Sequence, residues 1–412
     1  MDMYKELQTC RISPSKSLIP VLDLGVQALT GIFPKSADED VPLAPLEMVW
    51  CPDSGLVQLK HSVDPTEMYG ENYGYRSGLN PTMVQHLERK AKWLEDSFPL
   101  EESDVVLDIG SNDGTLLNSY RTENLARIGF DPVAKKYLHL YDHGVQVVTD
   151  FFSQPALAAI SSAKAKIITS IAMVYDLEDP VGFMAEIAGS LDVVGVWHFE
   201  QSYLPAMLRT NSYDTICHEH LEYYSLSVIQ SLLAVNGMKL LDVQTNSING
   251  GSFAVTAALE ESPHPVNTPV IEWLLRQEEN LGLTTAKPYD LFRDRVFQHR
   301  EDLRSLVSGL NRAGKKVVAY GASTKGNVLL QFCGFGPDDI ACVAEVNPEK
   351  FGSFTPGSGI PIVSEDEVRK MNPDYMLVLP WHFRDFIVQK ESGFLERGGR
   401  LIFPLPEIEI VS

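Results

Sequence analysis

Long apolar segments and positive charge are both scarce in this chain of 412 residues. No apolar run reaches the roughly 18 residues that a membrane helix needs, and the start MDMYKELQTC lacks a basic segment followed by an apolar one. Lys and Arg number 34 against 55 Asp and Glu, a net charge of −21, which argues against binding to nucleic acid polymers or membranes. We expect a cytoplasmic protein, a monomer or weak dimer, in which an anionic small substrate needs a local cationic pocket.

Cysteine is also sparse, with five scattered residues that do not form a disulfide framework. The segments Cys10-Arg-Ile-Ser13 and Cys51-Pro-Asp-Ser54 each have the spacing of half a structural zinc site. In both, serine occupies the second ligand position, and a neutral hydroxyl is a poor zinc ligand. The sequence therefore predicts no bound zinc, with Cys10 and Cys51 as the remaining ligands if zinc is retained.

The length predicts two or three domains. Residues 1–85 are rich in Pro and Gly, with short strands such as LIPVLDLG and GLVQL. Residues 86–260 begin with a helical pattern in TMVQHLERKAKWLEDSF and continue with the strands VVLDIG, ARIGFD, VQVVTD, AKIITSIAM and GVWHFEQ. Residues 261–412 follow an amphipathic region, about 266–313, with the strands KKVVAYGAS, ACVAEVN, YMLVLPW and GRLIFPL. The alternation predicts two α/β domains with parallel, doubly wound sheets behind a small module.

The most informative stretch is VVLDIGSNDGTLL, where a buried strand leads through Asp108, Gly110 and Gly114 into a helix. Glycines there allow close backbone approach to a ligand, but the spacing is not the G-x-G-x-x-G of dinucleotide binders. The next strand ends in Asp131, correctly placed to accept hydrogen bonds from a ribose. Together these features resemble the class I S-adenosylmethionine (SAM) methyltransferases. By that resemblance, Gly110 and Asn112 lie along the methionine, Asp131 binds the ribose, and Asp150 and Phe151 flank the adenine; Asp108, Gly114, Leu116 and Ser170 complete the predicted SAM site.

Two further segments combine side chains suited to a small-molecule site. MYGENYGYRSGLN places Tyr73, Tyr75 and Arg76 in a Gly-rich loop, either a substrate lid bearing a phenol or a turn that covers a domain junction. ICHEHLEYYS places His218 and His220 around Glu219, after a strand whose carboxyl end is where ligands bind. No H-E-x-x-H is present, so the alternatives are packing or a general base oriented by a carboxylate.

The segment AYGASTKGNVLL joins a third-domain strand to a helix through Ser323, Thr324 and Lys325. Backbone amides at a helix start and an ammonium group suit a phosphate or carboxylate, although the Walker spacing is absent. The alternative is a nucleotide-type fold that is used only for packing.

These motifs, with LDLG, NGGS and GGRLIFPLP, occur in the order seen in three-domain sugar C-methyltransferases, which the whole chain resembles. That family methylates C3 of a 4-keto deoxysugar on a nucleoside diphosphate. The resemblance implies a zinc-bearing N-terminal domain, a central SAM domain and a C-terminal domain that helps hold the sugar nucleotide. Carried over, His220 is the proposed base, Glu219 its adjacent acid and Tyr75 the loop tyrosine near the sugar. The chain departs from the family at Ser13 and Ser54, and at Cys217, where some members have a tyrosine.

The resemblance predicts a SAM-dependent enzyme that methylates C3 of a nucleoside-diphosphate-linked 4-keto-6-deoxy sugar through an enolate. The alternatives are an O- or N-methyltransferase of another small metabolite, or a noncatalytic SAM- or nucleotide-binding scaffold. Besides the three catalytic candidates, the predicted substrate contacts are Tyr73, Arg76, Tyr175, Glu200, His218, Tyr223, Asn249, Ser323 and Lys325.

Overall fold

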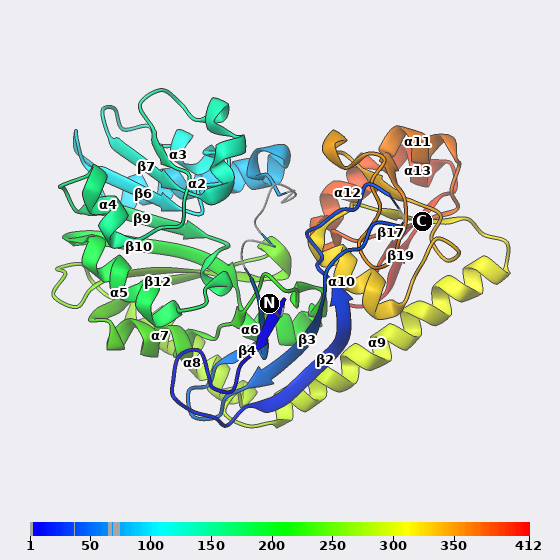
Figure 1. Cartoon of the computed structure of the whole chain (residues 1–412), viewed down its shortest axis with the longest axis horizontal. Coiled ribbons are helices and arrows are strands. Elements are labelled where there is room, and N and C mark those ends of the chain that lie inside the picture. Colours follow the sequence, from blue (N-terminus) through cyan, green and yellow to red (C-terminus); the bar gives the residue numbers. More distant parts are fainter. Residues whose placement is uncertain (1–2, 37, 65–67, 69–74) are drawn as a thin grey trace.

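A computed structural model describes residues 3–36, 38–64, 68 and 75–412. Two lobes stand side by side, one formed by the middle of the chain and one by its C-terminal part (Figure 1). The N-terminal strands and the long helix α9 (Lys287–Arg312) run along one side of the molecule, beneath both lobes in this view (Figure 1).

The N-terminal module contains a four-stranded sheet that is completed by a strand from much later in the chain. Its order is β11-β4-β3-β2, formed by β2 (Ile19–Ala28), β3 (Leu43–Trp50), β4 (Val57–Leu59) and β11 (Glu222–Tyr223). The pairs β2–β3, β3–β4 and β4–β11 are antiparallel. A separate pair joins β1 (Tyr4–Glu6) to β5 (His61–Val63). Because β11 directly follows the His-Glu-His segment, the N-terminal sheet anchors that segment.

The middle domain has a seven-stranded sheet of order β12-β13-β10-β9-β6-β7-β8. Its strands are β6 (Val105–Ile109), β7 (Ala126–Phe130), β8 (Gln146–Val148), β9 (Ala165–Ile171), β10 (Leu191–Ser202), β12 (Met238–Asn246) and β13 (Ser252–Leu259). The five predicted strands are confirmed as parallel neighbours. The sheet is not wholly parallel, however, because β13 pairs antiparallel with both β10 and β12. The turn between β12 and β13 makes this antiparallel hairpin possible.

Helices cover the middle sheet, and most of them begin with a side chain that caps the first turn. They are α2 (Pro81–Ser97), α3 (Thr115–Asn118), α4 (Gln154–Ile160), α5 (Pro180–Ser190), α6 (Leu204–Thr210) and α7 (Leu226–Val235). In α2, the side chain of Asn80 accepts from the amide of Thr82, and Pro81 occupies the first helical position. The apolar side chains of Met83, Leu87 and Leu94 are buried, as the helical periodicity predicts.

The C-terminal domain repeats the α/β design in a six-stranded sheet of order β16-β15-β14-β17-β18-β19. The strands are β14 (Val317–Tyr320), β15 (Val343–Glu345), β16 (Ile362–Ser364), β17 (Tyr375–Val378), β18 (Arg400–Phe403) and β19 (Glu409–Val411). The four predicted strands are confirmed as parallel. The short strands β16 and β19 were missed, and β19 runs antiparallel at the edge of the sheet.

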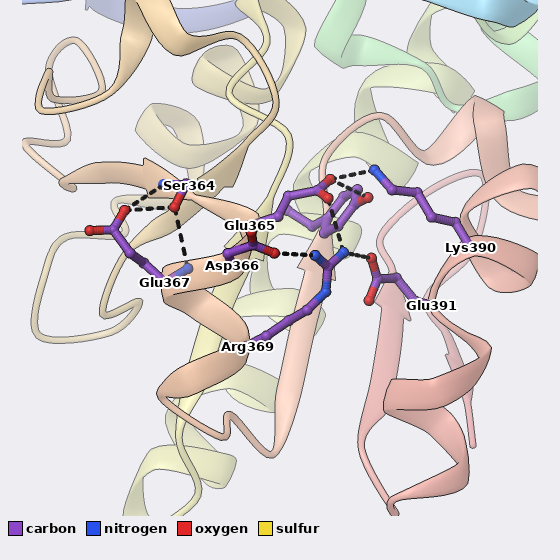
Figure 2. A network of polar contacts seen from close by, with 8 residues as sticks. Ser364, Glu365, Asp366, Glu367, Arg369, Lys390 and Glu391 are labelled. Carbon is purple, nitrogen blue, oxygen red and sulfur yellow. Dashed lines mark hydrogen bonds and ion pairs between the residues drawn. The ribbon is translucent and has the colours of Figure 1, made fainter.

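Two helices, α8 (Thr268–Leu281) and α9, form the predicted amphipathic region before this domain. The domain itself contains α10 (Thr324–Cys333), α11 (Glu365–Lys370), α12 (Arg384–Lys390) and α13 (Ser392–Glu396). A capping box between Ser364 and Glu367 starts α11 (Figure 2). Arg369 of α11 then donates to Glu365 at 2.9 Å and to Glu391, at the end of α12, at 2.6 Å (Figure 2). This network holds α11 against α12.

The hydrophobic cores link the domains. One continuous cluster runs from the N-terminal sheet, through α6 and the segment up to Tyr223, to α9 and the C-terminal sheet. A second cluster joins the middle sheet and α7 to Cys10, Cys51 and Leu56 of the N-terminal module. The N-terminal module therefore packs against both lobes and fixes their relative positions.

Candidate active site

A cavity of about 420 Å³ lies where the carboxyl ends of the middle strands face the C-terminal domain. The SAM-motif turn after β6, the ends of β9 and β10 and the His-Glu-His turn contribute to its wall, and so do Ser323, Lys325 and the segment after β17. This is the position expected for a ligand in an open α/β sheet, since strand order reverses between β6 and β9. Most predicted site residues line it: Tyr75, Asp108, Gly110, Asn112, Leu116, Asp131, Asp150, Phe151, Tyr175, Glu200, Glu219, His220, Asn249, Ser323 and Lys325.

The turn after β6 can accommodate the methionine end of SAM. Gly110 has φ +77, and a Cβ there would come within 3.1 Å of Met173, so glycine keeps this wall open. The carboxyl of Asp108 accepts from the hydroxyl of Thr169 at 2.6 Å, and burial raises the pKa of Asp108 to about 7. A buried carboxyl group of this kind is stabilised in its ionised form by a cation, which fits the ammonium group of SAM.

Asp131 lies at the end of β7 and organises the same turn. Its Oδ2 accepts from the amide of Asn112 at 2.8 Å, and its Oδ1 accepts from the amide of Val133 at 2.6 Å. Burial raises the pKa of Asp131 even though these amides favour the ionised form. Each carboxylate oxygen can accept a second hydrogen bond, so Asp131 can hold the turn and still bind ribose hydroxyls.

Two other predicted SAM residues do not reach the cavity. Gly114 is absent from the wall, and a Cβ there would come within 2.6 Å of the ring of Tyr141, so glycine serves the packing of that tyrosine. Ser170 is fully buried, and its hydroxyl accepts from the indole of Trp197 at 3.2 Å. Asp150 and Phe151 do line the cavity, where the half-exposed Phe151 offers a flat apolar surface.

His220 is held as a neutral imidazole with a defined tautomer. Its Nδ1 lies 2.7 Å from the carbonyl oxygen of Thr215, which can only accept, so Nδ1 carries the proton and Nε2 has the lone pair. Burial, reinforced by the positive charge of Lys325, lowers the pKa of His220 to about 3. The ring of Tyr175 packs against His220 with 4.3 Å between centroids. The arrangement presents a proton acceptor to the cavity.

Glu219 precedes His220 in a turn that is closed by a hydrogen bond from the His220 amide to the carbonyl of Cys217. Burial raises the pKa of Glu219 to about 7, and the thiol of Cys217, at 3.6 Å, is a weak donor. A Cβ at Gly31 would come within 2.5 Å of the Glu219 carboxyl group, so the N-terminal module packs directly against this acid. A carboxyl group with this pKa can hold or release a proton near neutral pH.

The C-terminal domain contributes a cation to the cavity. Lys325 extends from the start of α10 and donates to the carbonyl of Asn249 at 3.1 Å, which joins the third domain to the NGGS turn of the middle domain. Beside it, the indole of Trp381 donates to Asp214 at 2.8 Å, and the ring lies against Gly250, where a Cβ would come within 2.9 Å. Glycine in NGGS is therefore needed for the close approach of Trp381.

Glu200 lines the cavity but its carboxylate is already fully engaged. It lies 2.7 Å from His86 Nε2 and 2.7 Å from Lys90 Nζ, and it accepts from Asn246 at 2.8 Å. These partners outweigh burial and lower the pKa of Glu200 to about 2. Glu200 fixes α2 over the sheet and is not suited to accept a proton.

Several predicted substrate residues lie elsewhere. His218 is buried with Nε2 at 3.0 Å from the carbonyl of Ala44, and burial lowers its pKa to about 4. Tyr223 is buried in β11, within the core around the N-terminal sheet. Arg76 pairs with Asp113 at 3.2 Å and lies over the ring of Tyr137. The structure thus uses these three side chains for packing, while Tyr73 lies outside the described residues.

Sequence reasoning missed several residues that line the cavity, among them Met173, Gln201, Ser252, His382 and Phe383. Gln201 and His382 follow the same rule as the predicted ones, because each lies at or after the carboxyl end of a strand. The position of the segment PWHF, just after the carboxyl end of β17, could have indicated His382 and Phe383, but the segment contains no glycine-rich motif.

Comparisons with known proteins agree with this geometry. Residues 83–243 match the family described as "Methyltransferase domain", and residues 247–406 match "C-methyltransferase C-terminal domain". Over 417 aligned residues, the chain is 31% identical to the C-methyltransferase NovU of Streptomyces niveus, covering 100% of this chain and 98% of NovU. This chain belongs to the C-methyltransferase family. Its middle domain is accordingly a class I SAM methyltransferase domain, and the chain is a SAM-dependent C-methyltransferase.

Solved structures that resemble the chain include a complex of LepI with SAM and the mitomycin 7-O-methyltransferase MmcR. The LepI complex is 14% identical, with a TM-score of 0.33, and the match covers 44% of this chain and 54% of LepI. MmcR is 13% identical, with a TM-score of 0.35, and the match covers 44% of this chain and 55% of MmcR. In the described part of this chain, no helix is both long and apolar enough to cross a membrane.

Residues 10–69 match a family described as "Putative zinc binding domain". In this chain Cys10 and Cys51 do come together with serines, and the Cys10 thiol lies 3.2 Å from the hydroxyl of Ser54. Burial raises the pKa of Cys10, which disfavours the thiolate that zinc requires, whereas hydrogen bonds from Ser54 and Ser15 outweigh burial and lower the pKa of Cys51. Two thiols and neutral hydroxyls do not fit a structural zinc site, and hydrogen bonds take the place of metal ligands here.

Proposed function

We propose that this protein methylates C3 of a nucleoside-diphosphate-linked 4-keto-6-deoxy sugar. The observation that carries the proposal is the position of His220. A neutral imidazole of fixed tautomer shares one cavity with the SAM turn of the middle domain and with Ser323 and Lys325 of the C-terminal domain. A cavity of this composition suits a substrate that reaches from one domain to the other.

Carbon methylation requires a carbon that can act as a nucleophile. In a 4-keto sugar the ketone acidifies the C3 hydrogen, so a base can generate an enolate. His220 takes that proton on Nε2, while its Nδ1–H remains on the Thr215 carbonyl. In this proposal Glu219, adjacent in the same turn, orients or balances the charged ring, and Tyr75, which lines the cavity, hydrogen-bonds near the enolate oxygen. When bound at the turn after β6, SAM supplies the electrophilic methyl group.

The start of α10 suits the diphosphate. Ser323 caps the helix by accepting from the amide of Gly326, and the backbone amides of the first turn face an anion favourably. Asn249 and Ser323 border the cavity on this side. An O- or N-methyltransferase would also use a base, but it would not need a ketone in its substrate.

A panel of 4-keto and matched 4-hydroxy sugar nucleotides, each incubated with SAM and analysed by mass spectrometry, tests the proposal. We expect a gain of one methyl group only with a 4-keto compound. Equal methylation of the 4-hydroxy counterpart would favour transfer to oxygen, and no methylation of any member would overturn the proposed substrate class. Binding of SAM without any turnover would instead favour the scaffold alternative.

A further inference from the structure

The described residues that line the cavity are strongly unequal in charge. Six of them carry carboxyl groups, and Lys325 is the only lysine or arginine among them; the carboxyl groups belong to Asp108, Asp131, Asp150, Asp176, Glu200 and Glu219. Ionised carboxyl groups in this wall therefore repel a substrate that becomes negatively charged during the reaction. Among the described wall residues, Lys325 is the one lysine or arginine that can offset the new charge, whereas Tyr75 can add only a neutral hydrogen bond.

The Lys325 side chain leaves its own helix and reaches the opposite wall. Although Lys325 lies in the first turn of α10, its Nζ donates to the carbonyl of Asn249 in the middle domain. That single acceptor uses one of its three N–H groups. The Gly326 amide donates to the Ser323 cap, so a diphosphate would use the earlier amides of the first turn, while the ammonium group lies against the NGGS turn.

The charge of Lys325 acts to lower the pKa of four groups near it, namely His220 and His382 and, against the larger effect of burial, Asp214 and Cys217. It lowers the pKa of His220 and of His382, in each case after the larger effect of burial, and Asp214 partly opposes the effect of burial on the pKa of Lys325 itself. His220 and Lys325 therefore lie close enough to interact electrically across the domain boundary. In the free enzyme this repulsion makes proton uptake by His220 unfavourable. An anionic oxygen beside the ammonium group would remove the penalty.

We propose that Lys325 is a catalytic residue whose ammonium group stabilises the enolate oxygen that forms when His220 removes the C3 proton. In this step the C3–H bond breaks and its proton passes to Nε2 of His220. The electron pair of the broken C3–H bond forms the C3–C4 double bond, and the π pair of the C4 carbonyl moves onto its oxygen, which accepts a hydrogen bond from Nζ. This inference rests on the proposed function and assigns Lys325 to the reacting carbonyl instead of the diphosphate.

The test uses full-length protein and a 4-keto sugar nucleotide that the wild-type enzyme methylates. Exchange of the C3 hydrogen for deuterium, without SAM, reports enolate formation, and the Kd of the matching nucleoside diphosphate reports binding at α10. We expect Lys325→Gln, which retains a donor for the Asn249 carbonyl but no charge, to slow exchange about 10² to 10³-fold. We expect its Kd for the nucleoside diphosphate to change less than threefold. Lys325→Arg should restore part of the exchange rate.

Ser323→Ala is the matched comparison, since it alters the cap of α10 without removing a charge. It should weaken nucleoside diphosphate binding more than it slows exchange at saturation. A Lys325→Gln enzyme with a Kd weakened tenfold and normal exchange at saturation would overturn the inference and assign Lys325 to phosphate. Absence of exchange in the wild type would overturn the proposed function and this inference together. Melting temperature and SAM binding identify a variant that is misfolded, and Lys325→Met then repeats the measurement.

Discussion

The middle and C-terminal domains share one local design but present opposite charges to their common cavity. In each, a strand leads through a glycine of positive φ into a helix, and the next strand ends in an acid that holds the turn. Asp131 accepts from the amide of Asn112 at 2.8 Å, and Glu345 accepts from the amide of Ala322 at 2.9 Å. Asp131 lines the cavity, whereas Glu345 is absent from its wall.

The difference lies in what surrounds each acid. Glu345 also accepts from the amides of Val346 and Asn347, and Lys350 donates to the carbonyl of Ala322, so the second turn is satisfied by the protein itself. The turn after β6, in the middle domain, keeps carboxyl groups at the cavity and suits a cationic ligand. The same local design thus places carboxyl groups at the cavity in the middle domain and one cation, Lys325, together with the start of α10, in the C-terminal domain.

The largest effect is expected from removing the base, which acts between the parts of the cavity that the middle and C-terminal domains form. His220→Asn keeps a polar side chain but removes the imidazole base, so we expect turnover to fall about 10³-fold or more. The Kd values for SAM and for a nucleoside diphosphate should change by no more than a few fold, because neither the turn after β6 nor the start of α10 is altered. Stopped-assay rates and calorimetric titrations check both halves of this expectation. Near-normal turnover in His220→Asn would exclude His220 as the base.

Glu345→Ala tests whether the second acid is structural. The substitution leaves three backbone amides without their acceptor, and we expect a loss of about 2 to 3 kcal/mol in the free energy of unfolding, measured by chemical denaturation. SAM affinity in the folded protein should stay unchanged. A weaker affinity for SAM with unaltered stability would contradict the contrast between the two acids.

Asp108 should make ligand binding at the turn after β6 depend on pH. Its raised pKa means that the free carboxyl is protonated below about pH 7, and a bound ammonium group favours the ionised form. Binding then releases a proton, so affinity for S-adenosylhomocysteine should rise up to tenfold per pH unit below pH 7 and level off above it. Asp108→Asn should remove this rise, as followed by calorimetry from pH 5.5 to 7.5. A flat wild-type profile would refute the assignment.

The smallest effect is expected at the ionic network between α11 and α12 (Figure 2). Solvent screens the pairs of Arg369 with Glu365 and Asp366, but its partner Glu391 is buried, so Arg369→Ala should lower the free energy of unfolding by about 1 to 2 kcal/mol. Arg369 does not line the cavity, so kcat and KM should not change. Arg293→Ala, on α9, serves as a surface control, because its salt bridges to Asp290 and Asp294 are exposed on both sides.

Most of the parallel strands of the middle and C-terminal sheets could be predicted from the sequence, because buried parallel strands are apolar runs bounded by glycine. The sequence did not reveal β16, β19 or the β12–β13 hairpin, whose short or alternating patterns give weaker signals. In the site, residues within motifs such as Asp108, Asp131 and His220 were found. His218 and Tyr223 lie beside the base in sequence but face the N-terminal sheet, and only the pairing of β11 with β4 reveals this. Long-range pairing leaves no local pattern to read.

That pairing also sets the order in which the enzyme can mature on the ribosome. Strand β4 emerges about 160 residues before β11, and at 5 to 20 residues per second the interval is on the order of 10 to 30 s. Until then the edge of β4 has no partner, and the turn that carries His220 has no anchor. Catalytic competence must therefore arise late, after most of the methyltransferase domain has been synthesised, and a nascent chain interrupted before Glu222 should bear an unpaired edge that chaperones can recognise.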